Sequence, residues 1–195
     1  MVVETAQNQN KTIPFYKQTE IGYCHPACVK MVIDYAIDTI GVKQKRVSLS
    51  RIADVLKTHR FSGTVRENIE LINPVLRDSV PRIRFQSQIS ARFSDIKAEI
   101  DACRPVIAWI NIAPSDEDSI KHAVVITGYN VQKNEIYFVD PEMTVENHIR
   151  TLEMGTFLDE KLGVEARIIK LNVSKIGQKH LNGRITPYKR RRITK

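Results

Sequence analysis

Two cysteines lie in the stretch "QTEIGYCHPACVKMVIDYA", residues 18–36, where a polar segment meets an apolar one. The apolar residues recur at spacings of three and four, which predicts a helix that begins immediately after Cys24. They are Val29, Val32, Ile33 and Ala36. The N–H groups and the dipole of a helix N-terminus stabilise negative charge, so a thiolate is favoured at Cys24. This position suits a nucleophile, but a small core residue or a metal ligand paired with Cys28 fits it as well.

Nucleophilic catalysis by a thiolate also needs a base, a group that orients the base, and donors for an oxyanion. His122 opens the apolar run "HAVVITGYN", and Asp140 ends the next run, "EIYFVD". If these runs form a hairpin, the carboxylate of Asp140 returns to the level of His122 and can fix its tautomer. The Gln18 amide and the Cys24 N–H are the candidate oxyanion donors. Each of these residues also has an ordinary structural explanation.

The elements that must position these residues change character along the chain. Helices are predicted at residues 48–60, with Ser48 or Ser50 as the cap, in a short segment that ends before Pro74, and behind Ser94. Strands are predicted at residues 82–88, 105–113, 122–130, 135–140 and 165–173, with a helical segment at 149–163 before the last. Helices followed by antiparallel strands indicate an α+β fold in which the helical part packs on the sheet.

A zinc site is the main alternative that uses the same residues. Cys24, His25, Cys28 and His122 are all possible zinc ligands. However, the C-H-x-x-C spacing departs from that of usual zinc motifs, and the side chains of His25 and Cys28 diverge on a helix. We therefore expect neither a metal nor another cofactor. Cys103 and Trp109 are interpreted as core or turn residues.

The charge distribution divides the 195-residue chain into two parts. Residues 174–195 hold eight of the 30 Lys and Arg residues and no Asp or Glu, so the remaining 22 basic residues balance the 22 acidic ones. We expect one domain over residues 1–173 and a basic, flexible tail over residues 174–195. Such a tail is either merely solubilising or a docking arm for nucleic acid, the ribosome or another polyanion.

The same sequence bears on the cellular compartment. Three cysteines are an odd number for a disulfide framework, and the chain is long enough to fold without one. The N-terminus lacks the pattern of a signal peptide, and no apolar run is long enough for a transmembrane segment. We therefore expect reduced thiols and a cytoplasmic protein.

The ordered motifs resemble one family. "Q-x5-C-x-P-A-C", "SLSRIADVL", "GT", "RPVIAWI", "HAVVITGY" and "IYFVDP" together look like the double-glycine, bacteriocin-processing branch of the papain-like cysteine peptidases, over residues 14–173. The resemblance implies a papain-like fold, a peptide or protein substrate with small residues before the scissile bond, and four functional residues. These are Cys24 as nucleophile, His122 as base and acid, Asp140 as orienting group and Gln18 as oxyanion donor.

One position departs from the family pattern, because His25 stands where the family usually has glycine. We expect its imidazole either to narrow the substrate cleft or to alter which acyl group fits. Two other functions remain open from the sequence: a thioester-forming acyltransferase, which uses the same residues, and a catalytically silent binding module that docks on a polyanion through the tail.

Overall fold

The structure is a computed structural model that describes residues 13–41, 46–112, 121–143, 148–163 and 166–173. The basic tail predicted at residues 174–195, and therefore its boundary with the domain, lies outside these residues.

The first half of the chain is helical, as predicted. The main helix α1 spans Cys24–Ile40 and follows a short 3-10 turn, η1, at Ile21–Tyr23; α2 is Leu49–Val55, η2 is a 3-10 turn at Arg66–Leu71, and α3 is Ile72–Ser79. The hydroxyl of Ser48 accepts the Arg51 N–H at 3.2 Å and caps α2, which confirms that prediction. Helix α1 ends at Gly41, whose φ of 71° is left-handed and suits glycine.

Six strands of the described chain form one antiparallel sheet in the order β1-β6-β2-β3-β4-β5. They are β1 Ile83–Gln88, β2 Val106–Asn111, β3 Lys121–Asn130, β4 Glu135–Val139, β5 Ile149–Glu153 and β6 Ile168–Val173. Strands β3 and β4 form the predicted hairpin, with Asn134 in the left-handed conformation (φ 57°) at its turn. The α+β arrangement is therefore confirmed, consistent with a papain-like fold.

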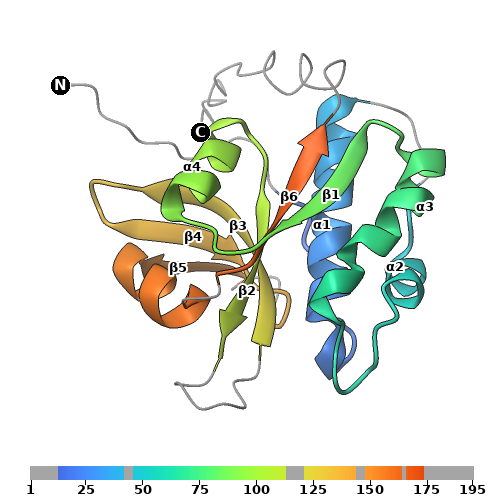
Figure 1. The fold of residues 1–195 in the computed structure, drawn as a ribbon, viewed down its shortest axis with the longest axis horizontal. Helices are drawn as coiled ribbons and strands as arrows, with labels where there is room; N and C mark the ends of the chain where they lie inside the picture. Colours follow the sequence, from blue (N-terminus) through green and yellow to red (C-terminus); the bar gives the residue numbers. More distant parts are fainter. Residues whose placement is uncertain (1–12, 42–45, 113–120, 144–147, 164–165, 174–195) are drawn as a thin grey trace, which may run out of the picture.

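Apolar layers cover both faces of the sheet. Helices α1, α2 and α3 lie beside one face, and the other carries α4 (Phe93–Asp101) and a π-helix, η3, at Thr156–Leu162 (Figure 1). Side chains of β2 alternate between the two cores: Ile107 and Trp109 belong to the first, Val106 and Ala108 to the second. This alternation explains why β2 is apolar at nearly every position.

Three local predictions were wrong. Helix α3 continues through Pro74, because proline is tolerated in a first turn, where its missing N–H would have no helical partner. Residues 149–153 are a strand rather than part of a helix, and Leu152 pairs with Ile136 of β4. This strand lies at the sheet edge and is mostly exposed, so its sequence carries little strand periodicity. Helix α4 begins at Phe93, ahead of Ser94, and the Arg92 N–H donates to Asp95 at 2.8 Å.

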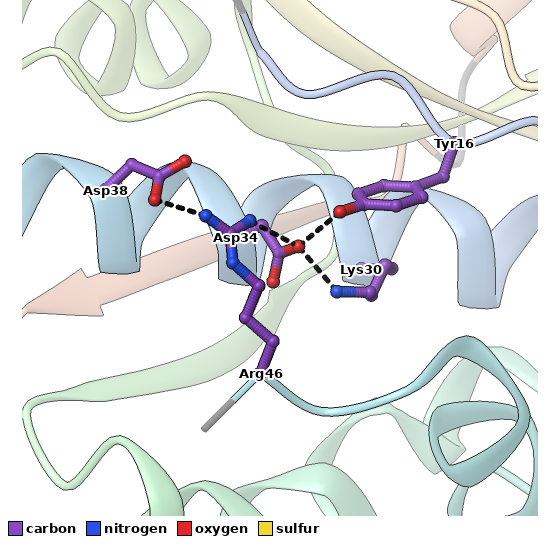
Figure 2. A network of polar contacts seen from close by, with 5 residues as sticks. All are labelled: Tyr16, Lys30, Asp34, Asp38 and Arg46. Atoms are coloured by element: carbon purple, nitrogen blue, oxygen red, sulfur yellow. Dashed lines mark hydrogen bonds and ion pairs between the residues drawn. The ribbon is translucent and has the colours of Figure 1, made fainter. Parts of the chain in front are cut away.

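A buried carboxylate fastens the segment before α1 to the helix itself (Figure 2). Asp34 is fully buried in α1, and its Oδ2 accepts from Tyr16 Oη at 2.5 Å, Lys30 Nζ at 2.5 Å and Arg46 at 2.8 Å. Arg46 also pairs with the exposed Asp38 at 2.6 Å. Tyr16 lies two residues before Gln18, so this network holds the approach to the candidate site.

Candidate active site

Cys24 is the first residue of α1. The preceding residue, Tyr23, supplies no capping side chain, and the first turn of α1 contains no acidic residue. The dipole of α1 therefore favours negative charge at the thiol, and no acidic residue of the first turn opposes it. The side chain is largely buried, yet it reaches the wall of a surface cavity.

His122 and Asp140 meet at the same edge of the sheet. His122 lies at the start of β3 and Asp140 directly follows β4, so the antiparallel hairpin brings them together. The distance from His122 Nε2 to Asp140 Oδ1 is 2.7 Å, and both side chains are buried. The same Oδ1 accepts the Glu142 N–H at 3.0 Å, and the Asp140 N–H donates to the His148 carbonyl at 2.9 Å. Asp140 is thus held in one orientation toward the imidazole.

The imidazole of His122 also interacts with Cys24. Burial alone would lower the pKa of His122, but the hydrogen bonds and charges of Asp140 and Cys24 raise it to about 10. Burial likewise favours the neutral form of Asp140, but its bonds to His122 and to the Glu142 N–H lower its pKa overall. Because Asp140 occupies Nε2, Nδ1 is the nitrogen left for the thiol. A protonated His122 beside Cys24 can stabilise a thiolate there.

Gln18 lies near the end of the sheet that carries Asp140, where it forms its own hydrogen bonds. Its backbone N–H donates to the Pro141 carbonyl at 2.9 Å, next to Asp140. Its side-chain Nε2 points to the Ile21 carbonyl at 3.4 Å, which is a long hydrogen bond, and Oε1 is buried without a partner among the described residues. The structure therefore ties Gln18 to Pro141, the residue after Asp140, and directs its amide N–H to the Ile21 carbonyl.

A cavity of about 640 Å³ opens beside Cys24. Its walls come from the start of α1, the loop that precedes η2 and the facing ends of β2 and β3. The lining residues are Ile21, Gly22, Cys24, Phe61, Ser62, Gly63, Thr64, Val65, Trp109 and Lys121. Sequence reasoning identified Cys24 among these, treated Trp109 as a core or turn residue and used residues 61–65 only through the "GT" motif, Gly63 and Thr64. That motif was the only signal, because the approach of this loop to the start of α1 is a long-range contact.

His25 does not narrow the cavity, contrary to expectation. Its imidazole is completely buried and meets the Trp109 ring edge-on, with centroids 4.8 Å apart. Neither ring nitrogen has a hydrogen-bond partner among the described residues, and burial lowers the pKa of His25 to about 3. The neutral ring lies behind Trp109, which itself lines the cavity. His25 therefore bears on the cavity through Trp109.

The four proposed zinc ligands do not form a cluster in the described part of the chain. The Cys28 thiol instead donates to the Ala123 carbonyl at 3.2 Å, and burial, with the charges of Cys24 and Asp140, raises its pKa well above the ordinary value. The only group of possible ligands found among the described residues is His122, Asp140 and Glu142, whose ligand atoms lie within 4.8 Å of one another. Two of these residues already bond to each other.

Comparison with known proteins identifies the family of the chain. The Peptidase C39 like family matches residues 10–161, which is most of the chain and includes Cys24, His122 and Asp140. A search of curated proteins found no match. Within the described residues, no helix is both long and apolar enough to cross a membrane. The match to the family covers far more than half of the sequence, and the chain therefore belongs to the Peptidase C39-like family.

Proposed function

We propose that the protein is a cysteine peptidase whose nucleophile is Cys24. The observation that carries the proposal is the 2.7 Å bond between His122 and Asp140, on an imidazole that also interacts with the thiol at the start of α1. A thiolate, a base and an orienting carboxylate are the groups that acyl transfer from a peptide requires. Membership of a peptidase-like family supports the same reaction class.

In the proposed mechanism, the Cys24 thiolate attacks the peptide carbonyl, and the Cys24 N–H stabilises the resulting oxyanion. His122 then donates its proton to the leaving amine as the C–N bond breaks, which leaves a thioester on Cys24. The neutral imidazole next takes a proton from water, which attacks the thioester and releases the acid. Asp140 keeps the ring in the tautomer that serves Cys24.

Gln18 is the proposed second oxyanion donor. To act, its amide must turn from the Ile21 carbonyl toward the cavity, and the 3.4 Å length of the present bond makes that exchange inexpensive. Its backbone bond to Pro141 keeps the residue at the site during such a turn. A Gln18→Ala variant should therefore lose kcat with little change in KM, because the donor is used mainly in the transition state.

The direct test is detection of the thioester. The full-length protein is mixed with a peptide library, quenched in acid and analysed by mass spectrometry for an acyl group on Cys24. Peptide cleavage with a transient adduct on Cys24, absent from the Cys24→Ala variant, supports the proposal; cleavage that persists in that variant overturns it. Addition of an amine nucleophile then measures the share of thioester that transfers to the amine, which separates hydrolase from acyltransferase.

A further inference from the structure

Three exposed apolar side chains gather around the cavity that contains Cys24. Ile21 is 75% exposed, Phe61 65% and Val65 60%, and all three line the cavity. Large apolar side chains left in water at one concave site are a feature of binding surfaces, because a ligand removes them from water. Ile21 belongs to η1, directly before α1, and the other two belong to the loop that precedes η2.

The loop that carries Phe61 is fixed by backbone contacts. His59 and Gly63 exchange hydrogen bonds of 2.8 Å in both directions, and the Gly22 N–H donates to the Arg60 carbonyl at 2.8 Å. A Cβ atom on Gly22 would lie 2.3 Å from the His59 oxygen and 2.7 Å from the Gly63 nitrogen, so only glycine allows this approach. The loop is therefore clasped to the turn that precedes Cys24.

The Phe61 ring is also flanked by its own neighbours. The Arg60 guanidinium lies 4.9 Å from the ring centroid, and the His59 ring lies 6.0 Å away in a tilted arrangement. Arg60 is held in turn by Glu20 at 3.1 Å. The aromatic side chain thus contacts two neighbours before any ligand arrives, and these contacts reduce the entropy that is lost when a ligand packs on it.

We propose that this wall, formed by Ile21, Phe61 and Val65, binds a bulky apolar side chain of the substrate close to the scissile bond. The inference rests on the proposed function, since it assigns a substrate class to the same site. It differs from the small residues that the family resemblance implies. Leucine or phenylalanine would bury apolar surface on all three side chains, whereas serine or aspartate has little apolar surface of its own to bury on them. Phe61 is the main specificity residue.

The first test measures binding without chemistry. Fluorescent alanine-based hexapeptides that carry one Leu, Phe, Ser or Asp at each position in turn are titrated into the Cys24→Ala variant. At one position, the Leu and Phe peptides should bind roughly ten- to a hundredfold more tightly than the Ser and Asp peptides. Equal affinities for all four residues at every position would overturn the inference.

The second test uses two further variants and a control in the same Cys24→Ala background. Phe61→Ser should remove most of the apolar preference, and Gly22→Ala, which displaces the loop, should reduce it as well. Ile89→Ser is the matched control, because Ile89 is 59% exposed and is not among the residues that line the cavity. Both variants should keep the circular dichroism spectrum of the parent. If the preference for Leu and Phe peptides is then as strong in Phe61→Ser as in Ile89→Ser, the assignment is contradicted.

A third arm separates this inference from the proposed function. Peptides with the same substitutions and a thiol-reactive vinyl sulfone end are added to the protein with Cys24 intact. If the binding assay shows apolar selectivity but Cys24 is not labelled, the proposed binding wall is supported and the proposed peptidase function is refuted. Labelling of Cys24 with no dependence on the substituted residue would retain the nucleophile and refute the wall.

Discussion

Replacement of Asp140 by asparagine isolates the charge of one carboxylate from its shape. Asparagine can still accept a hydrogen bond from His122 Nε2, so the ring keeps a partner while the negative charge disappears. His122 remains buried, and burial lowers its pKa. The pKa should therefore fall from about 10 toward the ordinary value of 6.5.

The size of the fall follows from the interactions at the ring. The interval from 6.5 to about 10 corresponds to about 5 kcal/mol at 1.36 kcal/mol per pH unit, and it is the net of burial, which lowers the pKa, and of Asp140 and Cys24, which raise it. A hydrogen bond to a charged group contributes about 1.5 to 3 kcal/mol, so Asp140→Asn should lower the pKa of His122 by about 1 to 2 pH units. The proposed hydrolysis should slow as well, because tautomer control is weakened.

The sign of the stability effect is fixed by the direction of the shift. A raised pKa stabilises the folded protein fully below about pH 6.5, and this contribution is lost as the pH rises through about 10. Asp140→Asn should therefore destabilise the protein most at or below pH 6.5 and least above about pH 10. The assay is an NMR titration of the His122 ring, combined with urea denaturation at both ends of this range. A variant in which His122 still titrates near 10 would refute the assignment of the shift to Asp140.

Three other predictions concern sites away from the His122 ring. Asp34→Ala should lower the free energy of unfolding, measured by urea denaturation, by about 3 to 5 kcal/mol, because it leaves the buried Lys30 ammonium without its carboxylate. Asp38→Ala removes a half-exposed ion pair and should lower it by less than about 1 kcal/mol. Equal losses in the two variants would contradict this account. Because the pKa of His25 is lowered to about 3, the stability of the protein should fall as the pH drops below 6.5. In the His25→Phe variant, the melting temperature should depend less on pH in this acidic range. An unchanged pH dependence would exclude His25 as its cause. Deletion of residues 174–195 should leave the cleavage of a small peptide unchanged and weaken salt-sensitive binding to duplex DNA. Unchanged DNA binding would show that the tail is not the segment that binds DNA.

The parts of the site that could be predicted are those set by local sequence. The start of α1 at Cys24 follows from helical periodicity, and the meeting of His122 with Asp140 follows from two adjacent strands joined by a tight turn. Neither inference needed a contact between distant parts of the chain other than the hairpin itself.

Other features depend on contacts that the sequence does not display. His25 is buried against Trp109, which lies on a strand far along the chain, whereas the glycine of the family pattern at this position led to the expectation that the imidazole narrows the cleft. Phe61 reaches the cavity because the small size of Gly22 allows the loop of residues 59–63 to pack closely against it. A glycine in the sequence does not indicate which distant segment packs against it. The edge strand β5 is mostly exposed and lacks the apolar alternation by which strands are recognised.

The most direct test of a primed Cys24 is its alkylation rate. The full-length protein and its His122→Ala variant are treated with iodoacetamide from about pH 5 to 9, and modification of Cys24, Cys28 and Cys103 is followed separately by mass spectrometry. We predict that Cys24 reacts rapidly near pH 6 and that the buried Cys28 reacts slowly. In the His122→Ala variant, Cys24 should no longer react faster than the other cysteines. A Cys24 as inert as Cys28 in the folded protein, or one whose rate is unaffected by loss of His122, would contradict the proposed nucleophile.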